Sequence, residues 1–188
     1  LHKERSLPLP KVVIPVHLSG QSCDMKEIAN LGRRYGFKII EDASHAVGGT
    51  YRGEPVGNCR YSDITVFSFH PVKIITTGEG GAALTNSAHL NHRMSLFRGH
   101  GITREVGQLA DTSRAPWYYE QQELGFNYRM TDILAALGLS QLERLESFVT
   151  LRNQLAASYD ESLTQSWIRP QKIPDEVTSS RHLYVVRV

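Results

Sequence analysis

The sequence has few cysteines, little net charge and no long apolar run. Its two cysteines, Cys23 and Cys59, lack the spacing of metal ligands, so we predict free thiols rather than a disulfide framework or a zinc site. Basic and acidic residues are interspersed and sum to +2, which gives no basic stripe and no reason to expect a nucleic-acid partner. No stretch reaches the roughly 18 apolar residues of a transmembrane helix, and residues 1–10 lack the apolar centre of a signal peptide. We therefore expect a cytoplasmic protein with no membrane partner.

The two ends of the chain suggest a partial sequence. It starts at Leu1 rather than methionine and ends at Val188, inside the predicted strand Leu-Tyr-Val-Val-Arg-Val. We therefore expect it to be a piece of a longer protein.

The first half of the chain alternates between strand and helix patterns. Residues 11–18 are rich in β-branched residues and predict a strand buried on both faces, with Pro15 at an edge, a bulge or a strand end. Asp24 can cap a helix that stops at Gly36, and residues 37–40 predict a second strand. Such a βαβ unit has parallel strands and binds ligands beyond their carboxyl ends, where Asp42 stands.

The same reasoning predicts the remaining elements. We expect a turn or hairpin over 48–57, strands over 63–69 and 81–86, a helix over 87–98, a long loop over 99–122, a helical region over 131–165 that is one long helix or two with a bend, and a new strand from 180. The resulting domains are an α/β domain over 1–130, a connecting helical region over 131–165, and the truncated start of a small α+β domain over 166–188.

Residues 67–81 place one lysine among apolar residues just before a glycine cluster. Lys73 is flanked by Val72 and Ile74, and such surroundings favour the neutral amine, which is a nucleophile able to form Schiff bases with carbonyl compounds, pyridoxal phosphate (PLP) included. The glycines that follow allow a tight turn close to a ligand. From this stretch alone, a strand with one surface lysine followed by a turn is an equal alternative.

A carboxylate and a lysine at neighbouring strand ends suit PLP chemistry. Asp42 can keep the pyridine nitrogen protonated by charge pairing, which lets the ring accept electron density from a carbanion. Lys73 can hold the cofactor covalently and then carry a proton between substrate and cofactor, general acid–base work worth roughly 10²–10⁴-fold in rate. These two are the candidate catalytic residues.

Three spaced motifs carry a resemblance to a known family. They are Glu-Asp-Ala-Ser-His-Ala at 41–46, Phe-Ser-Phe-His-Pro-Val-Lys at 67–73 with Thr-Gly-Glu-Gly-Gly at 77–81, and Gly-Phe-Asn-Tyr-Arg-Met at 125–130. With them the chain resembles the DegT/DnrJ/EryC1/StrS sugar aminotransferases over most of 10–188. The resemblance implies an α/β fold of the PLP-dependent transferase type I (aspartate aminotransferase-like), with a mainly parallel sheet flanked by helices.

The resemblance also implies roles for individual residues. Lys73 matches the lysine that binds the cofactor, Asp42 the partner of the pyridinium nitrogen, and His45 the residue that contacts the cofactor's phenolic oxygen. Ser68 resembles the phosphate-binding serine. Asn127 matches an asparagine that reaches the phosphate in the neighbouring subunit, which implies a homodimer with shared active sites.

The implied reaction moves an amino group from L-glutamate to C4 of a UDP-linked 4-keto-6-deoxy sugar. Residues 14–22 and 117–129 are most similar to family members of the pseudaminic acid pathway. Two alternatives remain: a family member that deoxygenates sugars, against which Lys73 counts because those relatives carry histidine there, and a non-catalytic α/β domain. The family's small-residue phosphate loop, its ring-stacking aromatic residue and its complete C-terminal domain are not present, so this chain alone should bind cofactor poorly.

Overall fold

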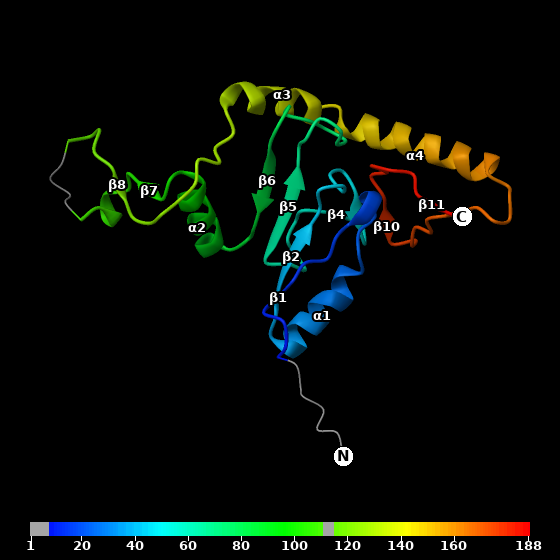
Figure 1. Cartoon of the computed structure of the whole chain (residues 1–188), viewed down its shortest axis with the longest axis horizontal. Coiled ribbons are helices and arrows are strands. Elements are labelled where there is room, and N and C mark those ends of the chain that lie inside the picture. The colour runs from blue at the N-terminus through cyan, green and yellow to red at the C-terminus, as the bar shows by residue number, and fades with distance from the viewer. Residues whose placement is uncertain (1–7, 111–114) are drawn as a thin grey trace, which may run out of the picture. The chain divides into compact units, whose positions relative to one another are not determined.

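The computed structural model describes residues 8–110 and 115–188, and these form two compact units (Figure 1). One unit combines the described residues up to Asn86 with Ile133–Val188, and the other is Ser87–Asp132. This division by contacts differs from the sequence-based partition at 130 and 165, which stays a prediction for the intact protein. Each unit is described by itself.

A four-stranded sheet forms the centre of the first unit, in the order β1-β2-β5-β6. The strands are β1 (Val12–Val13), β2 (Lys38–Asp42), β5 (Ile64–Ser68) and β6 (Gly81–Leu84). The pairs β1–β2 and β2–β5 are parallel, and β6 is antiparallel to β5. The sheet is therefore mainly parallel, as expected.

Helix α1 (Met25–Tyr35) makes the predicted connection between β1 and β2. Asp24 caps it by accepting a 3.3 Å hydrogen bond from the Glu27 backbone N–H, and Gly36 ends it with a left-handed φ of 77°. Three small or apolar residues of α1 are buried: Met25, Ala29 and Gly32. The capping signals in the sequence thus fixed both helix ends correctly.

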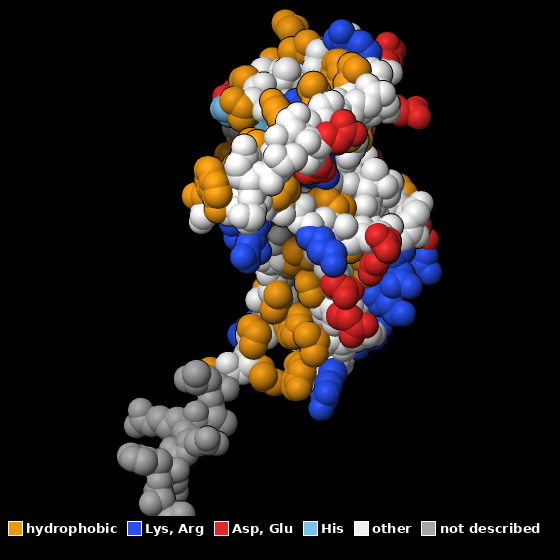
Figure 2. All heavy atoms as spheres, turned by 90° about the vertical axis from the view of Figure 1, so that its right-hand side faces the viewer, with side chains coloured by type: hydrophobic (Ala, Val, Ile, Leu, Met, Phe, Trp, Pro, Cys, Tyr) orange, Lys and Arg blue, Asp and Glu red, His pale blue; other side chains and the backbone are white. Residues whose placement is uncertain are grey.

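The prediction of a strand over 11–18 buried on both faces was wrong. The pairing covers only Val12 and Val13, with one isolated parallel bridge from Val16 to Asp42. Ile14 and Val16 are 58% and 47% exposed, because β1 is the edge of the described sheet and one of its faces is uncovered. Figure 2 shows apolar side chains on the surface near the start of the described chain.

The other predicted elements of this unit are present. Strands β3 (Thr50–Tyr51) and β4 (Glu54–Pro55) form the hairpin within 48–57, and β10 (Val177–Thr178) adds a third antiparallel strand. The helical region is two helices, α3 (Asp132–Leu142) and α4 (Leu145–Ser162), as the bent alternative predicted. The strand expected from residue 180 is confined to β11 (Val186–Arg187), which pairs with β9 (Arg169–Pro170).

One apolar cluster joins the carboxyl ends of the strands to α4. Its buried members are Ala43, Ala46, Val47, Phe67, Ile74, Ile75 and Val149. Ala43 follows the end of β2, Ile74 and Ile75 follow the turn after β5, and Val149 comes from α4. Burial of these side chains holds the two strand-end loops together, since each aliphatic side chain contributes roughly 1.5–3 kcal/mol on full burial.

The second unit holds helix α2 (Ala88–Arg98) and a small hairpin. Ser87 caps α2 by accepting a hydrogen bond from the Leu90 backbone N–H. The long loop expected over 99–122 was wrong in part: β7 (Ile102–Thr103) pairs with β8 (Glu120–Gln121), and a 3₁₀ turn covers Val106–Gln108. Part of that stretch, 111–114, lies outside the described residues.

Candidate active site

Asp42 is the last residue of β2, and its carboxylate lies at the carboxyl end of the strand. One carboxylate oxygen, Oδ1, accepts a 3.1 Å hydrogen bond from the Ser44 backbone N–H. Burial alone would raise the pKa of Asp42, but the bonds to Ser44 and the charges of His45 and Lys73 outweigh burial and lower that pKa below 3.8. Asp42 is therefore a carboxylate at neutral pH.

Lys73 lies in the turn that follows β5, not on a strand. Its backbone N–H donates to the His70 carbonyl at 2.9 Å, which closes the turn. The apolar surroundings expected for Lys73 are one-sided, because Ile74 and Ile75 are 5% and 4% exposed whereas Val72 is 64% exposed. Lys73 itself is half-buried, so its amine can be reached from solvent or by a ligand.

The parallel pairing of β2 with β5 brings Asp42 and Lys73 to the same edge of the sheet. Asp42 faces Val66 in the register, and Lys73 comes shortly after the end of β5. The two residues act on each other electrostatically, because the charge of Lys73 contributes to the lowered pKa of Asp42. The predicted neighbourhood of carboxylate and amine is thus present.

His45 lies in the loop after Asp42, and one hydrogen bond sets its tautomer. The backbone N–H of Ser19 donates to Nδ1 of His45 at 3.3 Å, which requires an unprotonated Nδ1 and places the ring proton on Nε2. Burial, followed by the charge of Lys73, lowers the pKa of His45 below 6.5 against the opposing effect of Asp42. His45 is therefore a neutral ring whose Nε2–H can donate a hydrogen bond.

His182 also lies at this site, and the sequence reasoning missed it. Its ring is 4.4 Å from the ring of His45 between centroids, at a tilt of 35°. Burial and the charges of His45, Lys73 and Arg152 lower the pKa of His182 to about 4. Residues 180–188 read as the start of a strand, and nothing in that pattern distinguished this histidine from a surface residue.

The segment that carries His182 is held in place by backbone contacts. The Ser180 hydroxyl donates to the His45 carbonyl at 2.9 Å, and the Ser180 backbone N–H donates to the Gly20 carbonyl at 3.1 Å. Nη1 of Arg152 on α4 donates to the Arg181 carbonyl at 3.1 Å. Three separate parts of the chain thus meet around His45.

Ser68 and His70 shape the turn before Lys73. Ser68 is the last residue of β5, is half-buried, and accepts a long 3.5 Å contact at Oγ from the His70 backbone N–H. The exposed ring of His70 accepts the Val72 backbone N–H at Nδ1, at 3.3 Å. His70 therefore supports the turn, while the Ser68 hydroxyl hydrogen can still be donated to an anion.

Asn127, the fifth predicted residue, belongs to the other compact unit. It lies in the unit Ser87–Asp132, where it forms an isolated antiparallel bridge with Gly99. Its side chain is exposed. Its predicted role in a partner's site stays a prediction.

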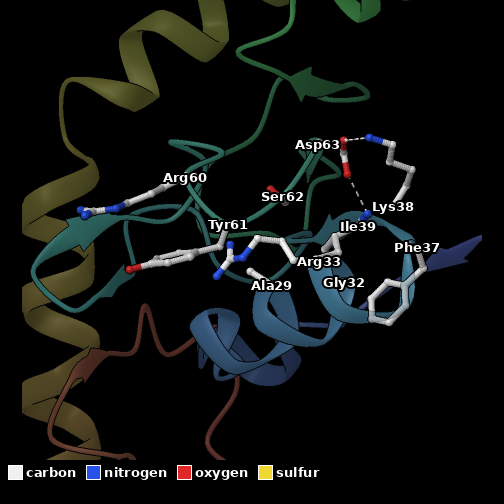
Figure 3. A pocket seen from close by; sticks show the side chains of 11 residues that line it. Ala29, Gly32, Arg33, Phe37, Lys38, Ile39, Arg60, Tyr61, Ser62 and Asp63 are labelled. Carbon is white, nitrogen blue, oxygen red and sulfur yellow. Dashed lines mark hydrogen bonds and ion pairs between the residues drawn. The ribbon is translucent and has the colours of Figure 1, made fainter.

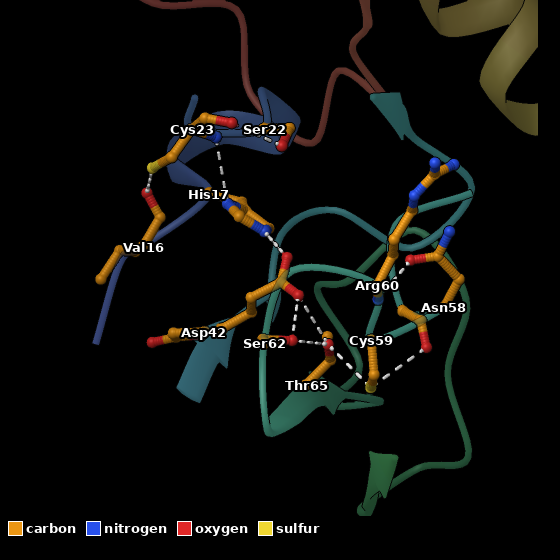
Figure 4. A network of polar contacts seen from close by, with 12 residues as sticks. Val16, His17, Ser22, Cys23, Asp42, Asn58, Cys59, Arg60, Ser62 and Thr65 are labelled. Carbon is orange, nitrogen blue, oxygen red and sulfur yellow. Dashed lines mark hydrogen bonds and ion pairs between the residues drawn. The ribbon is translucent and has the colours of Figure 1, made fainter. Parts of the chain in front are cut away.

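A buried polar network lies beside Asp42 (Figure 4). His17 is 0% exposed and Glu41 is 5% exposed. Nε2 of His17 is 2.7 Å from Oε2 of Glu41, and Oε1 of Glu41 accepts from the hydroxyls of Ser62 and, at 3.0 Å, Thr65. A buried carboxylate is tolerated only with such a full set of partners.

Burial, Cys23 and Glu41 together set the protonation of His17. Burial opposes a charged ring, but the Cys23 side chain and Glu41 raise the pKa of His17 to about 9, and the same contact lowers the pKa of Glu41 against its burial. The backbone N–H of Cys23 also lies 3.2 Å from Nδ1 of His17, a contact that needs the neutral ring. The Glu41 bond is shorter by half an ångström, so we conclude that the pKa of His17 is raised.

One surface pocket lies outside this site (Figure 3). It has a volume of about 390 Å³ and lies near the start of β2, where Lys38 pairs with Asp63 at 3.0 Å. Ligands of open α/β sheets bind beyond the carboxyl ends of the strands, which is the opposite end of β2. Within 8–110 and 115–188, no three His, Cys, Asp or Glu side chains are grouped to hold a metal, and both cysteines are free thiols.

The residues at the carboxyl ends of β2 and β5 fit PLP. Asp42 supplies an ionised carboxylate, Lys73 a reachable amine, His45 an Nε2–H donor and Ser68 a hydroxyl. In addition, Nδ1 of His182 is buried without a hydrogen-bond partner, which is typical of a polar site that a ligand completes. In the same order, the groups of Asp42, Lys73, His45 and Ser68 match a protonated ring nitrogen, an aldehyde, a phenolic oxygen and a phosphate.

A mainly parallel α/β sheet with this set of residues at its strand ends defines a PLP-binding protein of the type I fold. Comparison with protein families identifies which one: the family model described as "DegT/DnrJ/EryC1/StrS aminotransferase family" matches residues 3–188. The chain belongs to this family. The resemblance and the fold class inferred from the sequence are confirmed.

Curated relatives and solved structures agree with this assignment. The chain is 40% identical over 172 residues to the UDP-4-amino-4,6-dideoxy-N-acetyl-β-L-altrosamine transaminase of Campylobacter jejuni, covering 91% of this chain and 43% of the relative. It is 42% identical over 184 residues to the GDP-perosamine synthase of Caulobacter vibrioides, covering 96% and 46%. The PLP form of the putative sugar aminotransferase Spr1654 from Streptococcus pneumoniae superposes with a TM-score of 0.77 at 33% identity, covering 95% and 48%. The chain therefore spans about half the length of the relatives it matches.

Proposed function

We propose that the protein transfers an amino group from L-glutamate to C4 of a UDP-linked 4-keto-6-deoxy sugar, as a step toward pseudaminic acid or a related surface amino sugar. The observation that carries this proposal is the pair of Asp42 and Lys73 at the ends of two adjacent parallel strands. The similarity to the altrosamine transaminase supports the sugar. The similarity to a GDP-perosamine synthase makes the nucleotide the first point to test.

The residues of this chain divide the work between them. Bound PLP supplies an electron-accepting ring that stabilises negative charge on the carbon next to the transferred nitrogen. Asp42, ionised because its pKa is lowered, holds a proton on the ring nitrogen by charge pairing. His45 donates its Nε2–H to the phenolic oxygen and Ser68 its hydroxyl to the phosphate, which fixes the orientation of the ring.

Lys73 has two functions in the proposed reaction. Its amine would hold the cofactor through the cofactor's carbonyl group, and the same amine, when free, would act as the base that accepts and returns a proton at the substrate carbon. The turn that carries Lys73 is anchored by the buried Ile74 and Ile75. That anchoring holds the backbone from which the four-carbon side chain of Lys73 extends.

Asn127 is the residue on which the proposed homodimer rests. We place it at the phosphate of a second subunit's cofactor, so that two copies of the protein share their active sites. Its exposure supports a role toward a partner. The alternative of a sugar-deoxygenating member is disfavoured by Lys73, and the non-catalytic alternative by the joint presence of Asp42, His45 and Lys73.

Borohydride trapping tests the central claim. The intact protein is incubated with PLP, reduced with borohydride, digested and analysed by mass spectrometry. We expect the pyridoxyl group on Lys73 and a visible absorbance band that L-glutamate bleaches without any sugar present. Lys73→Ala should abolish both, whereas Lys38→Ala, a 73% exposed lysine side chain at the start of β2, should change neither.

The outcome of that experiment also separates the alternatives. An adduct on Lys73 without bleaching by L-glutamate would support the cofactor site but would contradict L-glutamate as the amino donor. No adduct at all, or a band that persists in Lys73→Ala, would contradict the aminotransferase proposal. UDP- and GDP-linked 4-keto-6-deoxy sugars, offered in parallel to the glutamate-treated protein, identify the acceptor by the mass of the amino sugar formed.

A further inference from the structure

The buried pair of His17 and Glu41 is attached to Asp42 by the backbone. The Asp42 N–H donates to the Pro15 carbonyl at 2.9 Å, and the His17 N–H donates to the Asp42 carbonyl at 3.0 Å. Both backbone polar groups of Asp42 are therefore bound by the segment that carries His17. That segment continues into residues 17–20, whose Ser19 N–H fixes the ring of His45.

Glu41, the residue before Asp42 in β2, also restrains the orientation of Asp42. Successive side chains of a strand point to opposite faces, so holding the Glu41 carboxylate on one face determines where Asp42 points on the other. Three groups from two parts of the chain hold that carboxylate: the His17 ring and the hydroxyls of Ser62 and Thr65. The pair therefore resists rotation of the strand end about its own axis (Figure 4).

The hydrogen bond between His17 and Glu41 completes a closed ring of contacts that includes Asp42. His17 contacts Glu41 through its ring and Asp42 through its backbone, and Glu41 precedes Asp42 in the chain. A shift of either partner must displace Asp42. By contrast, the hydrogen bonds of the Asp42 carboxylate come from the nearby Ser44, which restrains that carboxylate only locally.

We propose that His17 and Glu41 are positioning residues that aim the Asp42 carboxylate at the ring nitrogen of PLP. The inference rests on the proposed cofactor site and concerns residues that contact neither cofactor nor substrate in that proposal. It requires that loss of the pair weakens cofactor binding through the ring nitrogen, and not through general loss of structure.

A cofactor analogue makes this requirement measurable. PLP and its analogue with CH in place of the ring nitrogen are titrated into the intact apoprotein, and their dissociation constants are compared for wild type, Glu41→Gln and the double variant His17→Gln/Glu41→Gln. We expect PLP to bind about tenfold more weakly to both variants, the size of one charge-assisted hydrogen bond. The analogue, which has no nitrogen for Asp42 to pair with, should lose less than about twofold.

Two further variants complete the experiment. Lys38→Gln breaks an ion pair at the other end of β2 and should leave both dissociation constants unchanged. Ser62→Ala removes one partner of the Glu41 carboxylate and keeps the charged pair. It should also weaken the binding of PLP more than that of the analogue, by a smaller factor, and it provides the test if the other variants do not fold.

The outcomes separate this inference from the proposed function. Equal losses for PLP and the analogue, or no loss for either, would show that the pair is only structural. A wild-type protein that forms no reducible adduct on Lys73 would overturn the cofactor site and the inference with it. A normal adduct in wild type with unchanged variants would overturn the inference alone.

Discussion

The imidazole rings of His45 and His182 lie 4.4 Å apart between centroids. One ring follows the end of β2 and the other comes from the segment near the end of the described chain, so 137 residues separate them in sequence (182 minus 45). Lys73 acts on both and lowers the pKa of each. The site is therefore arranged to keep two neutral histidines beside one amine.

This arrangement predicts a coupled titration. Because the charge of His45 contributes to lowering the pKa of His182 to about 4, His45→Gln should move the pKa of His182 upward toward 6.5. The ring proton of His182, followed by NMR from pH 3 to 8, measures it. His89→Gln, an exposed residue of α2, is the control and should leave that titration unchanged. An unmoved pKa of His182 in His45→Gln would contradict the coupling.

The pair of His17 and Glu41 predicts how stability depends on pH. The lowered pKa of Glu41 gives a contribution that is present above 4.5 and is lost as pH falls through its folded-state value. The raised pKa of His17 gives a contribution that is present below 6.5 and is lost as pH rises through about 9. The pair should therefore stabilise the fold most between pH 4.5 and 6.5.

Chemical unfolding at a series of pH values checks this prediction. The free-energy difference between wild type and Glu41→Gln should be largest in that interval and should shrink on both sides. Asp63→Asn, which breaks the exposed ion pair with Lys38, is the comparison. A free-energy difference that does not vary with pH would show that folding leaves the pKa values of Glu41 and His17 unchanged.

At two glycines with left-handed φ, substitution by alanine should lower the free energy of unfolding by different amounts. Gly20 (φ 101°) and Gly53 (φ 79°) both adopt conformations unfavourable for alanine. A Cβ at Gly20 would also lie 2.6 Å from Ser180 Oγ and 2.8 Å from Arg181 N, whereas a Cβ at Gly53 has no neighbour within 4 Å. Gly53→Ala should cost about 1 kcal/mol of unfolding free energy and Gly20→Ala about 2–4 kcal/mol.

Gly20→Ala should also change the geometry of the candidate active site. Gly20→Ala displaces the segment of Ser180 to His182, so the NMR signals of the His45 and His182 rings should shift in this variant and not in Gly53→Ala. Equal costs with unshifted rings would show that a Cβ at residue 20 is accommodated without displacing residues 180–182.

Shared active sites predict subunit complementation. In a mixed dimer of Lys73→Ala and Asn127→Ala subunits, one site contains both substitutions and the other contains neither. Random mixing should therefore restore about a quarter of wild-type activity, from half of the dimers with one working site each. Activity is measured after unfolding and refolding the two inactive variants together; no recovery, or a protein that sediments as a monomer, would contradict sharing.

The sequence was most informative where the chemistry is local. The cap at Asp24 and the stop at Gly36 gave the ends of α1, because capping depends on neighbouring backbone groups. The residues around Asp42 and Lys73 pointed to the ends of β2 and β5, whereas His45 and Ser68 came from the family resemblance, and the roles of all four stay predictions. Burial was predicted less well: residues 12–16 have the composition of an interior strand, yet in this sheet they form an exposed edge.

The tertiary structure decided what these residues meet. Hydrophobic burial of Ile74, Ile75 and Ala43 in one cluster with Val149 holds the two strand-end loops together, and no local pattern specifies that packing. It also brings His182 onto His45 and His17 onto Glu41, contacts between residues 137 and 24 positions apart. Composition and motif therefore determined which chemical groups the protein carries, while long-range packing, whose energy depends on partners far apart in sequence, decided how those groups are charged and aimed.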